Sequence, residues 1–164
     1  AFTIEKGIFD TFYVNLDIDN QIANGGHISA DTLIWWMKQT DDARKVFGEK
    51  KVSPYDAVTL IKRWFFKLME EQQFHGMQIW GNGADFDNAI LKSACQNMDV
   101  ANPWHYLSNR CYRTIKSIFS NIPMRPEECK GTHHNALDDA INQANHLIKI
   151  FRILNNPIAG LIYK

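Results

Sequence analysis

The chain has 164 residues, which is enough for one compact domain with a core of its own. Apolar residues make up 45% and charged residues 22%, an ordinary balance for a soluble globular protein. The formal net charge at pH 7 is zero, which excludes a basic protein that coats nucleic acid non-specifically and leaves only a local site for such a partner.

Cysteine usage and hydropathy exclude further classes. Cys95, Cys111 and Cys129 show no Cys-x-x-Cys spacing, which argues against a disulfide framework or a zinc knuckle and favours a cytoplasmic location. The sequence contains no run of about 18 apolar residues, so no membrane span is predicted. The first ten residues do not resemble a signal peptide. They lack a starting Met and begin inside a strand-like pattern, so we expect natural residues upstream of Ala1.

The chain begins with a predicted β-hairpin. Residues 2–5 and 8–17 alternate apolar and polar side chains, and Gly7 between them supplies the turn. Residues 20–26, with the sequence NQIANGG, are expected to form a loop.

Two helices are predicted next. Ser29 is expected to cap the first, on which Leu33, Trp36 and Met37 share one face. The second begins at Thr40 and places two aspartates in its positively polarised first turn.

The middle of the chain carries the clearest helix start. Ser53-Pro54 combines an N-cap residue with proline at the first helical position, and an amphipathic helix over residues 55–72 follows. A short apolar strand over residues 77–81 comes next, and residues 82–97 turn into another helix.

The last third alternates short elements with one long helix. Residues 104–111 predict a short strand, residues 112–120 a helix, and residues 121–134 a polar loop. The final helix is expected to bury a stripe at spacings of three and four: Ala140, Ile141, Ala144, Ile148 and Phe151. This order of elements predicts a single α/β domain over residues 1–164, with a mixed β-sheet covered by helices.

Polar residues follow the predicted strand at Gly81. Ligand sites in open α/β sheets lie at the carboxyl ends of strands, so Asn82, Asp85 and Asp87 are candidate site residues. For Asp85, a purely structural role as the cap of the next helix is an equal alternative.

A second polar cluster, HHNALDDA, opens the last helix at residues 133–140. A carboxylate beside a histidine can hold a hard metal ion while the imidazole takes a proton from water. The structural alternative is an acidic first turn, which the helix dipole favours. Periodicity does not choose between Asp138 and Asp139, because they flank the predicted buried stripe at about equal angles.

Taken together, the two clusters resemble the DEDDh family of 3′–5′ exonucleases. The second motif of that family is an Asn followed by Phe-Asp after a strand, which Asn82 and Phe86-Asp87 match. Its third motif, His-x-Ala-x-x-Asp, is matched by His134, Ala136 and Asp139. The resemblance therefore favours Asp139 over Asp138 and His134 over His133.

Longer segments resemble the phage and bacterial branch that includes exodeoxyribonuclease VIII-like proteins, and the likeness runs from about Phe2 to Phe151. It implies an RNase H-like mixed sheet flanked by helices. The family's first motif, Asp-x-Glu on the central strand, is missing from this sequence. We therefore expect an N-terminally truncated chain that lacks its first strand.

The resemblance implies a metal-dependent 3′–5′ exonuclease that hydrolyses DNA or RNA. Asp87 and Asp139 would join the missing Asp and Glu in binding two Mg²⁺ or Mn²⁺ ions, and His134 would act as the general base. Asn82 would contact the substrate or order the loop. Trp36 is a candidate for stacking on a terminal base, although contacts with neighbouring elements explain it equally well.

Two other interpretations stay open. One is a nuclease-fold module that binds nucleic acid without cleavage, and with two of four carboxylates we expect weak catalysis from residues 1–164 alone. The other is an unrelated metal hydrolase built on His133, His134 and Asp138, for which no second ligand cluster is evident. An upstream Asp-x-Glu would support the exonuclease.

Overall fold

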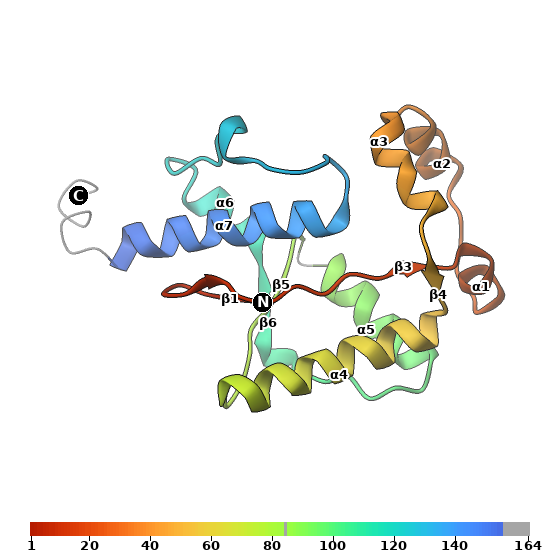
Figure 1. Ribbon diagram of the computed structural model, residues 1–164, viewed down its shortest axis with the longest axis horizontal. Coiled ribbons are helices and arrows are strands. Elements are labelled where there is room, and N and C mark those ends of the chain that lie inside the picture. Colours follow the sequence, from red (N-terminus) through yellow and green to blue (C-terminus); the bar gives the residue numbers. More distant parts are fainter. Residues whose placement is uncertain (84, 156–164) are drawn as a thin grey trace. The chain divides into compact units, whose positions relative to one another are not determined.

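The computed structural model of the protein describes residues 1–83 and 85–155 (Figure 1). The chain divides into two compact units, and each is described by itself. The first unit comprises residues 1–13 and the chain from residue 111 onward, and the second comprises residues 14–110. Each unit contains helices and strands, so the predicted α/β class is confirmed.

The first unit is built around the long last helix. Its elements are β1 (Phe2–Thr3), β2 (Gly7–Ile8), α6 (Tyr112–Ile118), the 3-10 helix η3 (Pro126–Glu128) and α7 (Ala136–Asn155). The second unit is built around the other long helix, α4. Its elements are β3 (Asn15–Leu16), α1 (Ile18–Ala23), α2 (Ala30–Met37), α3 (Asp41–Arg44), η1 (Lys45–Gly48), β4 (Lys51–Val52), α4 (Pro54–Gln72), β5 (Ile79–Gly81), α5 (Asp87–Asn97), η2 (Tyr106–Ser108) and β6 (Asn109–Cys111), where the chain passes into the first unit.

The strands of the described residues pair in three separate two-stranded sheets rather than in the one mixed sheet that the sequence predicted. The hairpin is confirmed as antiparallel β1–β2, with Thr3 opposite Gly7, and the φ of 78° at Gly7 explains the glycine. The second predicted strand is wrong beyond its first residues. Only Asn15–Leu16 is a strand there, and it pairs in parallel with β4.

Local capping explains where α2, α3 and α4 begin. Ser29 and Thr40 accept the N–H groups of Thr32 and Ala43, as predicted. Ser53 Oγ accepts the Asp56 N–H at 3.0 Å, with Pro54 at the first helical position. These starts could be predicted because each depends on residues within three positions of the cap.

The prediction of a loop over residues 20–26 is wrong in its first half. α1 covers Ile18–Ala23, because the side chain of Asp17 caps it by accepting the Asn20 N–H at 2.9 Å. This helix buries none of its residues. The sequence pattern therefore did not predict α1, because this helix depends on its cap rather than on a buried apolar face.

The core of the first unit lies along α7, which packs against α6 and β2. The predicted stripe is only partly correct. Ile148 is buried, Ile141, Ala144 and Phe151 are half-buried, and Ala140 is exposed. The buried residues of α7 are Asn142, His146, Leu147, Ile148 and Ile150. Asn142 and His146 are polar, so a hydrophobic stripe would place them toward solvent.

Buried His146 joins three segments of the first unit. Its Nε2 lies 2.7 Å from the Ile122 carbonyl oxygen, and its Nδ1 lies 2.8 Å from the Tyr112 hydroxyl. Because a carbonyl only accepts, Nε2 carries the hydrogen and Nδ1 accepts from the tyrosine. Burial raises the pKa of Tyr112, which keeps this hydroxyl a donor.

The core of the second unit lies between α4 and α5. Leu68 of α4 and Cys95 of α5 are each 1% exposed. Phe65 packs against the buried ring of Trp104, with ring centroids 6.3 Å apart. By contrast, α2 buries none of its residues, and the predicted shared face of Leu33 and Met37 is exposed.

Within the described residues, no helix is long and apolar enough to cross a membrane.

Candidate nuclease site

The segment before α7 is fixed by hydrogen bonds from the helix to the loop backbone. Asn142 both accepts the Lys130 N–H at 3.0 Å and donates to the Lys130 carbonyl at 2.9 Å. Asn135 caps the helix by accepting the N–H groups of Leu137 and Asp138. The backbone that carries His133 and His134 is therefore held at both ends.

The two aspartates at the start of α7 differ in their contacts. Asp138 Oδ2 accepts the Thr132 N–H at 2.8 Å, which ties this carboxylate to the preceding loop. A Cβ at Gly131 would lie 2.2 Å from Asp138 Cγ, so only glycine leaves room for this contact. The side chain of Asp139 makes no hydrogen bond or ion pair with the described part of the chain. Asp138 thus has a structural role, and Asp139 is available to a ligand.

The two histidines before α7 also differ. His134 is half-buried and adopts a left-handed φ of 70°, whereas His133 is exposed. Their ring centroids lie 3.8 Å apart in an edge-on arrangement. For a residue other than glycine this backbone region costs about 1–2 kcal/mol, and such strain is often found at functional sites. The fixed loop therefore holds His134 in a conformation that it would not adopt on its own.

At the start of α5, Asn82 and Asp87 are brought together. The Asn82 N–H donates to Asp87 Oδ2 at 2.5 Å, so the first helical residue folds back on the end of β5. Gly81 makes this approach possible, since a Cβ there would lie 2.9 Å from Asn88 Oδ1 and 3.1 Å from Asp87 Cβ. The glycine that ends the strand therefore sets the position of the candidate ligand.

A network of buried amide hydrogen bonds, which the sequence did not predict, supports the Asp87 turn. Asn88, 8% exposed, donates to the Ile79 carbonyl at 3.1 Å and to Asn109 Oδ1 at 3.3 Å. The same Asn109 oxygen accepts Trp104 Nε1–H at 2.9 Å. Asn88 directly follows the motif residue Asp87, and its position in the first turn was the only signal that could have indicated this role.

Two other candidates have different surroundings. Asp85 is exposed, and no side chain caps α5, whose N-cap residue is Phe86, so the alternative role of Asp85 as the cap is wrong. Trp36 is half-buried and meets Trp35 and Phe47 edge-to-face, with ring centroids 5.1 and 5.2 Å apart. These contacts favour a packing role for Trp36, although part of its ring remains accessible.

The candidate residues belong to different units. Asn82, Asp87 and Trp36 lie in the second unit, and His134 and Asp139 lie in the first. Within neither unit do three or more His, Cys, Asp or Glu side chains of the described residues gather as a metal site.

Comparison with known proteins assigns the chain to a family. Residues 1–151 match the model of the 3′–5′ exoribonuclease Rv2179c-like domain. The chain belongs to this family. The Rv2179c-like match spans both units and includes every candidate residue. No curated protein and no solved structure matches the chain.

Membership of the Rv2179c-like family confirms the expectation of a 3′–5′ exonuclease. The nucleic-acid substrate class follows from the same match. The exodeoxyribonuclease VIII-like branch, the RNase H-like sheet and the individual site residues remain predictions.

Proposed function

We propose that this protein is a metal-dependent 3′–5′ exoribonuclease of the DEDDh type, on an RNase H-like fold, that removes nucleotides from the 3′ end of RNA. The observation that carries the proposal is the Rv2179c-like exoribonuclease match over residues 1–151. In this proposal, Asp87 and Asp139 would bind the metal ions, and His134 would act as the general base.

The donor chemistry of these positions fits Mg²⁺ or Mn²⁺. Asp87 is exposed and Asp139 half-buried, and both carry carboxylate oxygens, which hard divalent cations prefer. Two such ions, when bound, would polarise the phosphodiester and stabilise charge on the leaving oxygen. The Asp-x-Glu pair expected to complete the ligand set is not part of this sequence.

His134 would accept the proton of the attacking water. A neutral imidazole accepts a proton through a ring nitrogen, and the backbone around His134 is fixed by the start of α7. Asn82 would order the Asp87 turn through its N–H, leaving its side-chain amide for the substrate. Trp36 remains a weaker candidate for base stacking, given its contacts with Trp35 and Phe47.

The contrast between the two neighbouring aspartates of α7 provides the sharpest test. The full-length protein should release mononucleotides from 5′-labelled single-stranded RNA with Mg²⁺ and not with a chelator. Asp139→Asn should abolish this release. Asp138→Asn is the matched control and should retain it, because asparagine keeps an oxygen that accepts the Thr132 N–H.

Other outcomes would change the proposal. RNA binding by the wild-type protein without metal-dependent release would support the alternative of a binding module. Faster degradation of single-stranded DNA than of RNA would overturn the substrate assignment. Loss of activity in Asp138→Asn but not in Asp139→Asn, with both variants folded, would support the hydrolase built on His133, His134 and Asp138.

A further inference from the structure

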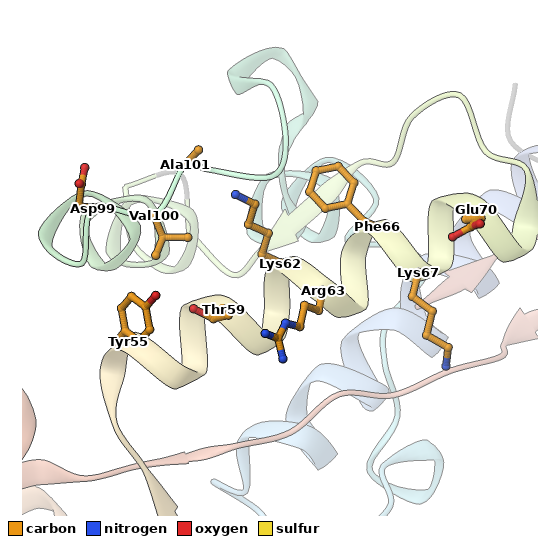
Figure 2. A pocket seen from close by; sticks show the side chains of 10 residues that line it. All are labelled: Tyr55, Thr59, Lys62, Arg63, Phe66, Lys67, Glu70, Asp99, Val100 and Ala101. Carbon is orange, nitrogen blue, oxygen red and sulfur yellow. The ribbon is translucent and has the colours of Figure 1, made fainter.

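The outer face of α4 and the segment after α5 enclose a hollow of about 640 Å³ in the second unit (Figure 2). We call it the α4 groove. It is lined by Tyr55, Thr59, Lys62, Arg63, Phe66, Lys67, Glu70, Asp99, Val100 and Ala101. None of the candidate nuclease residues lines it, so its composition calls for a separate explanation.

The groove face of α4 is the face that the core leaves outside. Its lining positions from residue 55 to residue 70 recur at spacings of three and four, opposite the buried face that carries Phe65 and Leu68. A solvated helix face is normally polar, yet Tyr55 is 56% and Phe66 48% exposed. Two large rings on this face therefore stand out against its charged neighbours.

The opposite wall has a defined backbone. Asp99, which follows the C-cap residue Met98 of α5, adopts a left-handed φ of 52°. The Asp99 N–H donates to the Gln96 carbonyl at 3.1 Å, and the Val100 N–H donates to the Cys95 carbonyl at 2.9 Å. These bonds close the end of the helix, so that Asp99, Val100 and Ala101 form a fixed wall.

Charged side chains lie on both sides of the groove face of α4. In Figure 2 Lys62 and Phe66 project from α4 on the side of Asp99–Ala101, whereas Arg63 and Lys67 extend in the opposite direction. Two acids, Glu70 and Asp99, also line the groove. Lys67 lies 3.8 Å from Glu71 of the same helix, and both side chains are solvent-exposed.

Three cations and two exposed rings on one face of α4 fit a ligand that carries both phosphates and flat apolar faces. Single-stranded nucleic acid has this combination, because phosphates meet lysine and arginine while bases stack on aromatic side chains. An acidic peptide would satisfy the cations but would leave the rings unused. Residues 55–70 extend over about 22 Å of helix, the length of roughly six stacked nucleotides.

We propose that the α4 groove binds a single-stranded segment of the RNA substrate other than its 3′-terminal nucleotides. This proposal rests on the exoribonuclease function above. The groove would raise the affinity for RNA and would favour longer strands. The motif residues, by contrast, would act on the 3′ end.

The test compares RNAs of two lengths in the full-length protein. In Lys62→Gln/Arg63→Gln/Lys67→Gln, the KM for a single strand of about 15 nucleotides should rise at least about tenfold, while hydrolysis of an RNA of about three nucleotides stays unchanged. The salt dependence of binding, measured between roughly 50 and 200 mM salt with a chelator present, should fall by about 2 in log–log slope. Phe66→Ala should weaken binding of the longer strand about fivefold or more.

Matched controls remove the same groups elsewhere. Lys50→Gln/Lys92→Gln/Lys116→Gln removes three exposed cations that do not line the groove, and Tyr106→Ala removes an exposed ring. Both should leave KM and the salt slope unchanged. Circular dichroism melting checks that every variant is folded.

The failure of this proposal can be told from the failure of the proposed function. If wild-type protein degrades both RNAs and the groove variants behave as the controls do, the groove assignment is wrong and the exoribonuclease stands. Equal competition by polyglutamate, together with no effect of Phe66→Ala, would identify an acidic-peptide surface and overturn the groove assignment. If the wild-type protein degrades neither RNA, the exoribonuclease proposal fails first.

Discussion

The starts of α7 and α5 hold their aspartates by different means. At α7, side chains of the helix reach back to the loop: Asn142 to Lys130, and Asp138 to Thr132. At α5, the backbone of Gly81 lies close to the side chains of Asp87 and Asn88. The buried amide of Asn88 also stabilises the turn by donating to the Ile79 carbonyl. The comparison shows that side-chain hydrogen bonds to the loop backbone position one helix start, whereas a close approach at a glycine and a buried amide position the other.

The largest expected effect tests whether the two regions serve one reaction. Asp87→Asn and Asp139→Asn should each lower the rate of RNA degradation by at least about 100-fold, since even residues that only support a metal ligand contribute roughly 10–100-fold. If the two carboxylates act together, the double variant should be no slower than the worse single variant. Single-turnover rates measure this, and multiplicative losses would separate the two regions functionally.

Next in size is the glycine of the α7 loop. Gly131→Ala should lower the free energy of unfolding by about 2–3 kcal/mol, because the residue has a φ of 82° and its Cβ would collide with the Asp138 carboxylate. Chemical denaturation measures the change. Gly76→Ala is the control, since a Cβ there meets no atom within 4 Å. A Gly131→Ala protein as stable as the control would show that Asp138 does not clamp the loop.

Replacing Gly81, the glycine of the α5 turn, should lower stability less than replacing Gly131. It should also lower the rate of RNA degradation. Gly81 lacks a positive φ, so Gly81→Ala meets only the tight contacts at 2.9 and 3.1 Å, and we expect a loss of about 1–2 kcal/mol. Because the displaced atoms belong to Asn88 and Asp87, RNA degradation should fall as well. Unchanged kinetics in a destabilised variant would mean that the position of Asp87 is not critical.

The smallest effect concerns charge in the loop that leads to α7. The Arg125 N–H and the Lys149 ammonium hold the pKa of Glu128 below its ordinary value of 4.5. A lowered folded-state pKa stabilises the fold at pH above the ordinary value and ceases to do so as the pH falls through the lowered one. In Glu128→Gln, the melting temperature should therefore fall less steeply as the pH is lowered than it does in the wild-type protein. Glu127→Gln should show the wild-type dependence on pH.

Local signals explain what could be predicted from the sequence. The caps at Ser29, Thr40 and Ser53 depend on neighbouring residues and were correct. The start of α7 was predicted as a site from its motif, and the choice of Asp139 over Asp138 depended on the resemblance. The contact of Asp138 with Thr132 could not be predicted from periodicity, because it involves the backbone of the preceding loop.

Long-range pairing explains what could not be predicted. The residues after Ile8 read as one strand, yet Asn15–Leu16 pairs with β4, more than thirty residues away. Buried Asn142 and His146 were missed because a hydrophobic stripe assigns polar side chains to the surface, although partners elsewhere in the unit satisfy both. Asn88 was missed for the same reason.

The hydrogen bonds of His146 have a practical consequence for chemical labelling. With 2% of its surface exposed and each ring nitrogen engaged, this imidazole offers no accessible lone pair to an acylating reagent such as diethyl pyrocarbonate. Modification of the folded protein should therefore report on the other five of the six histidines. Protection by bound RNA would then reveal whether His134 is shielded, without interference from the core.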